Sequence, residues 1–362
     1  MTAGTAGTAG AGGTDHGPAS RVVLASWPTP LEPAPRLARA VGLGPDDLWI
    51  KRDDLIGLGG GGNKVRKLEW LCGAALAAGA KTLVTSGAPQ SNHARLTAAA
   101  GARLGLGVVL VLAGNPDDSA SGNLALDGLL GAEIVWAGDA DGTALAATLK
   151  EVTDRLRREG AAPALIPFGG SSVTGALGYA ECGRELLAQA PDLSQVITAV
   201  GSGGTMAGLV HTLGGERVLG VHCGAVPDPV RTVSDLVAGL SAEGVTADGV
   251  VPEGEVPEGE VPDGVAPDGV APEGLRIRLD QVGDGYPSLT EPVKAAMSVA
   301  ARTEGIILDP VYTGRAMAGL IAAVKDGDVR PGRRTVFLHS GGLPGFFGHG
   351  ATVTWAKNPG LQ

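Results

Sequence analysis

Hydrophobic residues occur along the chain in short runs, each followed by an alanine-rich segment with helical spacing. The runs "TLVTSG" (82–87), "GVVLVLAG" (107–114) and "AEIVWAG" (132–138) open this series. The same format returns in residues 196–214, 218–226 and 335–348. Uninterrupted apolar runs are typical of strands buried on both faces of a parallel sheet and covered by helices. The pattern predicts an α/β protein, and a chain of 362 residues that is 44% hydrophobic is long enough for two lobes.

Polar and glycine-rich residues gather where the predicted strands end. Ligands of parallel sheets bind beyond the carboxyl ends of the strands. This rule directs attention to residues 86–95, 201–205 and 339–345.

A run of four glycines, residues 59–62, precedes Asn63 and Lys64. Glycine destabilises regular helices and strands, so the run predicts an irregular loop. After Lys64, apolar residues recur with helical spacing, which predicts that a helix starts here. The loop therefore delivers a single amine to the start of a helix.

The segment "GSGGTMAG" (201–208) follows a predicted strand and precedes a predicted helix. Glycines let backbone N–H groups crowd around an anion, and a helix N-terminus adds partial positive charge, so the segment can bind a phosphate. Neither this segment nor "GGNKV" (61–65) contains the Gly-Lys-Ser/Thr of a P-loop. A strand-to-helix turn without a ligand has the same composition, so this motif alone leaves both interpretations open.

Side chains that can hold a small carboxylate mark the other strand ends. The cluster "QSNH" (90–93) contains Ser91, which can cap the following helix, and the cluster as a whole offers donors for a carboxylate. Ser340 supplies a hydroxyl at another strand end, and Tyr286 and Tyr312 lie in glycine-flanked turns. A tyrosine hydroxyl that only satisfies the backbone would give the same pattern. The combination of one lysine, one phosphate loop and several hydroxyls fits pyridoxal phosphate, an aldehyde that bonds to a lysine amine.

Charge and composition exclude several classes of protein. The net charge of -10 argues against a nucleic-acid surface. No apolar run is long enough to span a membrane, and the N-terminus lacks the pattern of a signal peptide. The three cysteines are widely spaced in apolar segments, which predicts reduced, buried thiols and no metal site. We therefore expect a cytoplasmic protein that binds neither nucleic acid nor a membrane.

Two segments have low complexity. Residues 1–14 repeat Thr-Ala-Gly, which predicts a disordered tail over residues 1–18. Residues 251–275 repeat Pro-Glu-Gly or Pro-Asp-Gly every five residues, a pattern that suits successive turns in a solvated loop. One carboxylate in five residues is too sparse for a calcium site.

Six segments of the chain resemble one enzyme family. They are "PTPLEP", "IKRDDLIGLGGGGNKVRKLEWL", "GAPQSNHARLTAAAGARLGL", "GSGGTMAGL", "LDPVYTGRAMAGL" and "HSGGLPGFFG". The chain is similar to the D-cysteine desulfhydrase and 1-aminocyclopropane-1-carboxylate deaminase family from about Trp27 to Gly348. The family consists of fold type II pyridoxal phosphate enzymes, relatives of the tryptophan synthase β chain.

The resemblance implies an α/β fold with two lobes, each a mostly parallel sheet flanked by helices. Residues 19–74 and 166–362 would form a large domain that binds pyridoxal phosphate, with the acidic repeat inserted at about 246–275. Residues 75–165 would form a small α/β domain. The family also suggests a homodimer.

The resemblance also implies roles for individual residues. Lys64, Tyr286 and Tyr312 would be catalytic, with Lys64 bonded to pyridoxal 5'-phosphate. Substrate would be bound by Ser91, His93 and Thr313. The cofactor would be held further by Asn92, Gly201, Gly203, Gly204, Thr205 and Ser340. Ser340 would face the pyridine nitrogen, where a neutral hydroxyl suits elimination better than long-lived carbanion chemistry.

Three features favour the desulfhydrase branch of this family. Thr313, Ser340 and "QSNHAR" (90–95) stand where the deaminase branch typically has glutamate, leucine and "QSNQTR". The implied reaction is α,β-elimination of D-cysteine, a small amino-acid substrate, to pyruvate, ammonia and hydrogen sulfide. Three alternatives stay open: a 1-aminocyclopropane-1-carboxylate deaminase, a lyase for another β-substituted alanine such as cysteate, and a non-catalytic nucleotide-binding protein.

Overall fold

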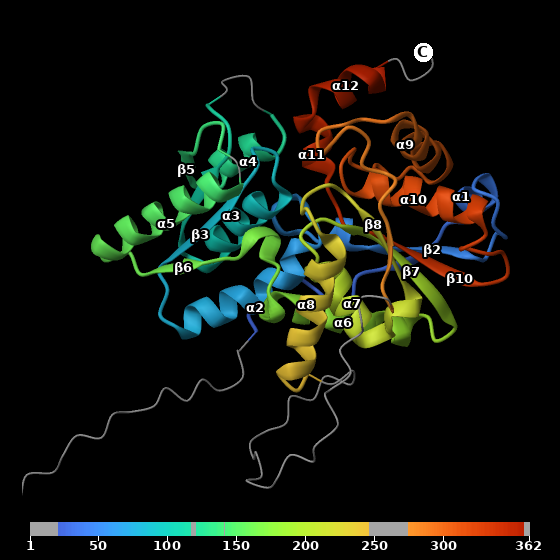
Figure 1. Cartoon of the computed structure of the whole chain (residues 1–362), viewed down its shortest axis with the longest axis horizontal. Coiled ribbons are helices and arrows are strands. Elements are labelled where there is room, and N and C mark those ends of the chain that lie inside the picture. Colours follow the sequence, from blue (N-terminus) through green and yellow to red (C-terminus); the bar gives the residue numbers. More distant parts are fainter. Residues whose placement is uncertain (1–20, 117–120, 141, 246–273, 358–362) are drawn as a thin grey trace, which may run out of the picture.

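Two sets of buried strands form two separate sheets in the computed structural model of the chain (Figure 1). The structure describes residues 21–116, 121–140, 142–245 and 274–357. The large sheet has the strand order β1-β2-β10-β7-β8-β9, and the small sheet has the order β5-β4-β3-β6. Within the described ranges every neighbouring pair is parallel except β1 with β2. The prediction of a two-lobed, mostly parallel α/β fold is confirmed.

The predicted strands supply most of the small sheet and the centre of the large one. The large sheet contains β1 (Leu31–Pro33), β2 (Leu48–Arg52), β7 (Leu193–Val200), β8 (Val218–His222), β9 (Arg276–Arg278) and β10 (Arg334–His339). The small sheet contains β3 (Thr82–Gly87), β4 (Gly107–Leu112), β5 (Glu133–Trp136) and β6 (Pro163–Leu165).

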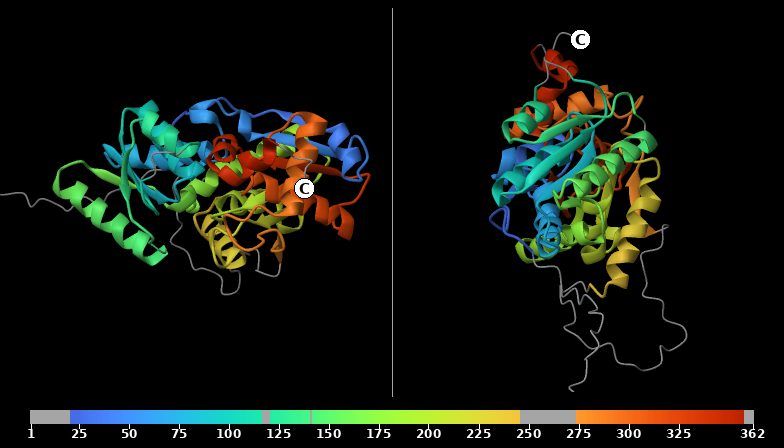
Figure 2. Two further views of the ribbon diagram at one scale, coloured as in Figure 1. Left: turned by 90° about the horizontal axis from the view of Figure 1, so that it is seen from above. Right: turned by 90° about the vertical axis from the view of Figure 1, so that its left-hand side faces the viewer.

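Helices cover both faces of each sheet, and the two lobes lie side by side along the long axis (Figure 2). One face of the large sheet shares its core with α1 (Pro35–Ala40), α9 (Glu291–Glu304) and α10 (Thr313–Asp326). The other face packs against α6 (Val173–Gln189), α7 (Gly204–Leu213) and α8 (Pro229–Ala242). The small sheet packs between α5 (Gly142–Arg158) and a group formed by α2 (Lys64–Ala77), α3 (Asn92–Leu104) and α4 (Asn123–Leu129). The short elements are η1 (Asp53–Leu55), η2 (Leu58–Gly60), η3 (Phe168–Gly170), η4 (Gly215–Arg217), α11 (Leu343–Gly348) and α12 (Gly350–Lys357).

Strand β4 shows why the apolar runs are uninterrupted. Successive side chains of a strand point to opposite faces of the sheet. Leu110 and Leu112 belong to the core shared with α2 and α3, whereas Val109 and Val111 belong to the core shared with α5. Because both faces are covered, each of these positions is buried and apolar.

The domain boundaries stay a prediction, although the strands of the small sheet all lie within the range 75–165 proposed for the small domain. The predicted tail at residues 1–18 lies outside the described residues, and so does nearly all of the acidic insert, which was placed at about 246–275. Cys72, Cys182 and Cys223 are buried free thiols, as predicted. None of the helices in the described ranges combines the length and apolarity needed to cross a membrane.

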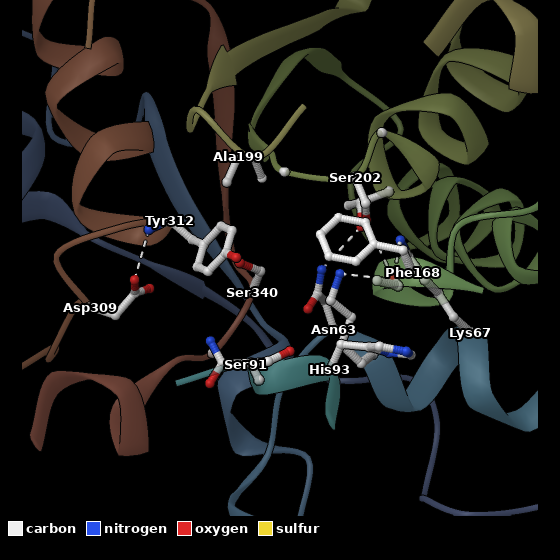
Figure 3. Close-up of a pocket in the computed structure, with 18 residues that line it drawn as sticks. Asn63, Lys67, Ser91, His93, Phe168, Ala199, Ser202, Asp309, Tyr312 and Ser340 are labelled. Atoms are coloured by element: carbon white, nitrogen blue, oxygen red, sulfur yellow. Dashed lines mark hydrogen bonds between the residues drawn. The ribbon is translucent and has the colours of Figure 1, made fainter. Parts of the chain in front are cut away.

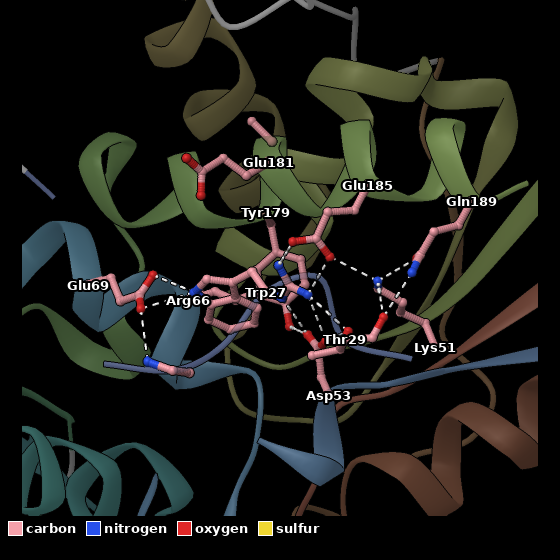
Figure 4. A network of polar contacts seen from close by, with 12 residues as sticks. Trp27, Thr29, Lys51, Asp53, Arg66, Glu69, Tyr179, Glu181, Glu185 and Gln189 are labelled. Atoms are coloured by element: carbon pink, nitrogen blue, oxygen red, sulfur yellow. Dashed lines mark hydrogen bonds and ion pairs between the residues drawn. The ribbon is translucent and has the colours of Figure 1, made fainter. Parts of the chain in front are cut away.

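A buried polar network fixes helix α2 against the rest of the large lobe (Figure 4). Arg66 of α2 donates hydrogen bonds to both carboxylate oxygens of Asp53, at 2.8 and 3.0 Å, and to Glu185 of α6, at 2.8 and 2.9 Å. Tyr179 donates to Asp53 as well, at 2.5 Å. Burial opposes ionisation of Asp53, but the charge of Arg66 and these hydrogen bonds hold the pKa of Asp53 below its usual value. The network therefore sets the position of the first turn of α2.

Candidate active site

Most of the predicted site residues line one pocket at the carboxyl ends of β3, β7 and β10 (Figure 3). The start of α2 and the segment that follows β6 complete its walls. The predicted residues in the lining are Lys64, Ser91, Asn92, His93, Gly201, Gly203, Thr205, Tyr312 and Ser340. Three predicted residues, Gly204, Tyr286 and Thr313, are not part of this lining. The strand-end rule applied to the sequence therefore selects residues that the structure brings together at one pocket.

The glycine run brings its loop into close contact with two other backbone segments. A Cβ atom on Gly61, whose φ is +77°, would lie 2.3 Å from the carbonyl oxygen of Asp54. A Cβ atom on Gly341, just beyond β10, would lie 2.6 Å from the Cα atom of Gly62, whose φ is +127°. Side chains at these positions would push the loop away from the strand ends. The glycines thus let the loop pack closely against the backbone at Asp54 and Gly341, which places Lys64 at the pocket.

Two amines of α2 lie close together at this pocket. Lys64 Nζ donates to the carbonyl oxygen of Gly169 at 3.0 Å. Lys67 Nζ, almost one helical turn later, donates to Ser171 Oγ at 3.0 Å. Burial lowers the pKa of Lys64 to about 8, and burial together with the charge of Lys64 lowers the pKa of Lys67 well below its usual value. Within the described ranges neither amine pairs with a carboxylate.

The loop that leads into α7 lies against these amines. A Cβ atom on Gly204 would lie 2.7 Å from Ser171 Oγ and 3.1 Å from Lys67 Nζ, so glycine is required there. The Gly204 backbone N–H donates to Ser171 Oγ at 3.1 Å. Thr205 Oγ1 accepts a hydrogen bond from Asn63 Nδ2 at 3.0 Å. Gly204 therefore contributes to the site from just behind the lining.

The start of α3 contributes the next side chains of the pocket. Ser91 caps the helix, because its Oγ accepts the backbone N–H of Ala94 at 3.1 Å. Asn92 Oδ1 accepts a hydrogen bond from Asn123 Nδ2 at 3.0 Å, which fixes the orientation of the Asn92 amide. Capping and substrate binding are compatible for Ser91, since a hydroxyl has two acceptor lone pairs and one donor.

His93 is buried with one ring nitrogen engaged. Its Nε2 lies 3.0 Å from Thr85 Oγ1, and its Nδ1 has no hydrogen-bond partner among the described residues. Burial and the charges of Lys64 and Lys67 lower the pKa of His93 well below its usual value. The ring is therefore neutral at neutral pH.

The two predicted tyrosines form a pair. Their hydroxyl oxygens are 2.6 Å apart, and the rings meet edge to face at an interplanar angle of 74°. Tyr312 lines the pocket, whereas Tyr286 lines an adjoining hollow that shares Ser91, Phe168 and Tyr312 with it. Burial raises the pKa of Tyr286 to about 12 and that of Tyr312 well above its usual value. Both phenols therefore keep their protons at neutral pH.

Thr313 is placed behind the pocket, on Asp309. It is fully buried, and its Oγ1 donates to Asp309 Oδ2 at 2.8 Å while accepting the Asp309 backbone N–H at 2.9 Å. Asp309 Oδ1 also accepts the backbone N–H of Tyr312, at 2.7 Å. The hydroxyl that we predicted to bind substrate is thus engaged with Asp309, and its substrate role stays a prediction.

Several residues of the lining were not predicted from the sequence. They are Asn63, Lys67, Phe168, Gly169, Ser202 and Asp309, together with smaller neighbours. Lys67 had a detectable signal, because a residue three positions after Lys64 lies on the same face of a helix. The sequence "FGG" (168–170), separated by two residues from the end of β6, was a second such signal. The sequence around Asp309 contains no such signal. Its place in the lining follows from its hydrogen bonds with the turn at Tyr312 and Thr313, which only the structure shows.

The residues present fit pyridoxal phosphate. An amine with a lowered pKa, that of Lys64, suits attack on an aldehyde. A phosphate would be held by Lys67 and by the glycine loop before α7, where Gly203 has a φ of +86° and the N-terminus of the helix follows. Two amines without carboxylate partners favour an anionic ligand, because an anion would offset the cost of burying positive charge.

Comparisons with known proteins agree with this assignment. A family model described as "Pyridoxal-phosphate dependent enzyme" matches residues 22–341. A protein of Pyrococcus abyssi (strain GE5 / Orsay) named putative 1-aminocyclopropane-1-carboxylate deaminase is 38% identical over 336 residues, which cover 91% of this chain and 94% of that protein. A D-cysteine desulfhydrase of Klebsiella pneumoniae subsp. pneumoniae is 37% identical over 342 residues, which cover 91% of this chain and 96% of that protein. Such similar identities do not choose between the two names.

Two solved structures extend the comparison. One, titled as the crystal structure analysis of an ACC deaminase homologue, superposes with a TM-score of 0.77 at 34% identity and covers 92% of this chain and 95% of its own. A processed threonine deaminase of Solanum lycopersicum has a TM-score of 0.57 at 20% identity, with 87% and 79% of the two chains covered, and supports the fold alone. The family match, the relatives and the pocket agree on the cofactor, which is pyridoxal phosphate. The chain belongs to the pyridoxal-phosphate dependent enzymes, in the family of fold type II whose members include 1-aminocyclopropane-1-carboxylate deaminases and D-cysteine desulfhydrases.

Proposed function

We propose that the protein is a carbon–sulfur lyase that acts on D-cysteine or a closely related β-substituted alanine. D-Cysteine and one water would give pyruvate, ammonia and hydrogen sulfide. The observation that carries the proposal is the convergence of Lys64, with a pKa of about 8, and the Tyr286–Tyr312 pair on one pocket and the hollow that adjoins it.

When bound, pyridoxal phosphate supplies an electron sink that stabilises negative charge at the α-carbon of an amino acid. Lys64 Nζ removes the α-proton, because its lowered pKa leaves a substantial neutral fraction near neutral pH. Lys67 and the loop before α7 hold the phosphate, and Ser91 binds the substrate carboxylate, with the neutral His93 beside it in the lining. In these roles the donors of the pocket fix the substrate relative to Lys64.

The tyrosine pair can assist the loss of the sulfur by donating a hydrogen bond to it. The two hydroxyls share one hydrogen bond, so one O–H is left to donate. A raised pKa keeps that proton on the phenol, so the pair would donate a hydrogen bond to the departing sulfur, which leaves as hydrosulfide. Phe168 borders both the pocket and the adjoining hollow.

The surroundings of Thr313 favour the lyase over the cyclopropane-opening deaminase. The deaminase branch typically carries glutamate at this position, as the sequence resemblance implies. Here the side chain is fully buried and lies 2.8 Å from Asp309 Oδ2, so a second carboxylate would be buried beside the first. Like charges at such a distance strongly disfavour ionisation of both groups. The deaminase remains the second candidate because a relative of that name is 38% identical.

An end-point panel tests the proposal. Purified protein loaded with pyridoxal phosphate would be incubated separately with D-cysteine, L-cysteine, cysteate and 1-aminocyclopropane-1-carboxylate, and pyruvate, sulfide and 2-oxobutanoate would be measured. We expect pyruvate and sulfide from D-cysteine and little 2-oxobutanoate from the cyclopropane. Faster release of 2-oxobutanoate than of sulfide would replace the lyase by the deaminase.

We further infer from the family resemblance that the enzyme is a cytoplasmic homodimer. Light scattering coupled to size-exclusion chromatography would measure the mass of the assembly. A monomer at micromolar concentration would contradict the inference.

A further inference from the structure

Arg315 is a buried cation at the start of α10, close to both tyrosines. Its side chain is fully buried, with 0% of its surface exposed. Nη1 donates to the carbonyl oxygen of Cys223 at 2.7 Å. Nη2 donates to the carbonyl oxygens of Gly285, Tyr286 and Ser288, at 2.8, 2.9 and 2.9 Å respectively.

These partners are unusual for a buried guanidinium. In the described part of the chain none of its hydrogen bonds goes to a carboxylate, and Nε has no partner. Burying a charge without a paired countercharge is costly, and an apolar residue of similar volume is often as stable or more so. The hydrogen bonds that Arg315 makes to backbone carbonyl oxygens therefore explain an arginine at this position better than a gain in stability does.

What it holds is the turn at residues 285–288, which carries Tyr286. Apart from Arg315, this turn has two hydrogen bonds among the described residues. Ser288 N donates to the Gly285 carbonyl oxygen at 3.1 Å, and the Tyr286 hydroxyl meets Tyr312 at 2.6 Å. The first lies within the turn, so Arg315 supplies the polar contacts that tie the backbone of the turn to the rest of the lobe.

The packing beside the turn is tight as well. A Cβ atom on Gly224, whose φ is +74°, would lie 3.0 Å from Val282 Cγ1, a tight contact, and 3.6 Å from both Arg315 Nη1 and the backbone nitrogen of Tyr286. The end of β8, the start of α10 and the turn thus meet at the guanidinium. A displacement of the guanidinium would be passed directly to the backbone of Tyr286.

We propose that Arg315 is a positioning residue that holds the turn at 285–288 so that the Tyr286 hydroxyl meets the Tyr312 hydroxyl at the pocket. Arginine suits this role because its planar group presents several donors in a fixed fork, whereas the donors of lysine radiate from a single atom. The kinetic part of the test rests on the proposed lyase function, and the structural part does not.

A double-mutant cycle tests whether Arg315 acts through Tyr286. The variants are Arg315→Lys, Tyr286→Phe and the combination, each loaded with pyridoxal phosphate. We expect Arg315→Lys to lower kcat on D-cysteine by about 100-fold, the size of effect produced by small misplacements of a reacting group. In the Tyr286→Phe background the same change should cost less than about 3-fold, because the hydroxyl that it positions is already absent. Losses that multiply in full would overturn the proposal.

Hydrogen exchange supplies a readout that needs no substrate. In Arg315→Lys, amides of the peptide that spans residues 282–289 should exchange at least about 10-fold faster, while the absorbance of the cofactor bound to Lys64 stays unchanged. Lys325→Met, on the exposed last turn of the same helix, is the matched control and should change neither quantity. Unchanged exchange in Arg315→Lys would also overturn the proposal.

Gly285→Ala provides a second route if Arg315→Lys does not fold. Gly285 has a φ of +136°, which an alanine rarely adopts, so the variant perturbs the same turn and leaves Arg315 intact. Its loss of kcat should likewise disappear in the Tyr286→Phe background, and persistence of the loss would contradict the proposal. If no substrate in the panel is turned over, the lyase function fails, and the exchange measurement still decides the role of Arg315.

Discussion

Two cations stand next to each other on helix α2 and are buried in different ways. Arg66 is 2% exposed and pairs with Asp53 and Glu185, whereas Lys67 is 1% exposed and, among the described residues, donates hydrogen bonds only to a hydroxyl and a carbonyl oxygen. Burial by itself lowers the pKa of both side chains, because it disfavours their charged forms. The charge of Asp53 nevertheless raises the pKa of Arg66 well above its usual value, while burial lowers that of Lys67 well below.

This difference distinguishes two faces of α2. The structural side, with Arg66, is bound to carboxylates, and the chemical side, with Lys64 and Lys67, lines the pocket. A paired cation holds α2 in place and needs no ligand, since its charge is already compensated. Lys64 and Lys67 lack such compensation and lie beside the glycine loop before α7. We propose from this comparison that amines without a carboxylate partner among the described residues mark the anion-binding site, whereas paired cations hold the helix in place.

The largest effect is expected at Lys64. Lys64→Ala should abolish turnover and the visible absorbance of the bound cofactor, because no other amine occupies the same place at the start of α2. Lys81→Ala, an exposed lysine after the same helix, is the control and should retain both. Steady-state assays and absorbance spectra measure the outcome, and normal activity in Lys64→Ala would sink the assignment.

Matched substitutions of the two neighbours test the comparison itself. In cofactor-free protein, Arg66→Met should lower the free energy of unfolding by about 3–5 kcal/mol, because it leaves Asp53 buried without its partner. Lys67→Met should cost less than about 1 kcal/mol or even stabilise the protein, because it removes a buried charge that has no carboxylate partner. Denaturant titrations followed by circular dichroism give both free energies of unfolding. Equal losses in the two variants would contradict the distinction between a paired and an unpaired cation.

Lys67 should matter more once the cofactor is present. Lys67→Met should weaken binding of pyridoxal phosphate by about 10- to 100-fold, the range expected for loss of one charge-assisted hydrogen bond to the phosphate. Equilibrium titration of the cofactor-free variant with pyridoxal phosphate measures the affinity, with Lys325→Met as the control. An unchanged dissociation constant would show that Lys67 does not contact the phosphate.

A smaller effect is expected in the pH dependence of the cofactor-free protein. The pKa of Lys64 is about 8 in the folded chain and 10.5 as its ordinary value, so between these limits the unfolded chain binds more protons than the folded one. Stability should therefore rise with pH across this window. Lys64→Met should flatten the rise, whereas Lys81→Met should not. Denaturation midpoints measured from pH 7 to 10, about the accessible range, provide the test, and a rise unaffected by Lys64→Met would contradict the shifted pKa.

The fold and the location of the pocket could be predicted from the sequence where they depend on local patterns of residues. The start of α2 at Lys64 follows from the glycine run and the helical spacing after it, and the observed helix begins at that residue. The strand ends follow from apolar runs that are covered on both faces. These features depend on neighbours within a few residues, which is why one sequence suffices.

Features that depend on distant partners were not accessible in this way. Hydrophobic periodicity assigns charged residues to solvent, yet α2 buries Arg66, Lys67 and Glu69. The carboxylates that make this tolerable for Arg66 come from 13 residues earlier and 119 residues later in the chain. No local pattern distinguishes Arg66, which is paired, from Lys67, which is not.

Thr313 shows the same limit at shorter range. Its place in a motif suggested contact with substrate, and in the structure its hydroxyl is bonded to Asp309, four residues earlier. The sequence does not reveal that Asp309 folds back onto the first turn of α10. Its substrate role therefore needs a direct test, for which Thr313→Val and Thr313→Ser provide matched variants.

The most direct test of the account is to locate the covalent attachment of the cofactor. Protein loaded with pyridoxal phosphate would be reduced with borohydride, digested and analysed by mass spectrometry to find the modified lysine. We predict that the label lies on Lys64, while Lys67 and Lys51, which is paired with Glu185, stay unmodified. A label on Lys67 or Lys51 would contradict the assignment of Lys64 as the lysine that bonds to the cofactor.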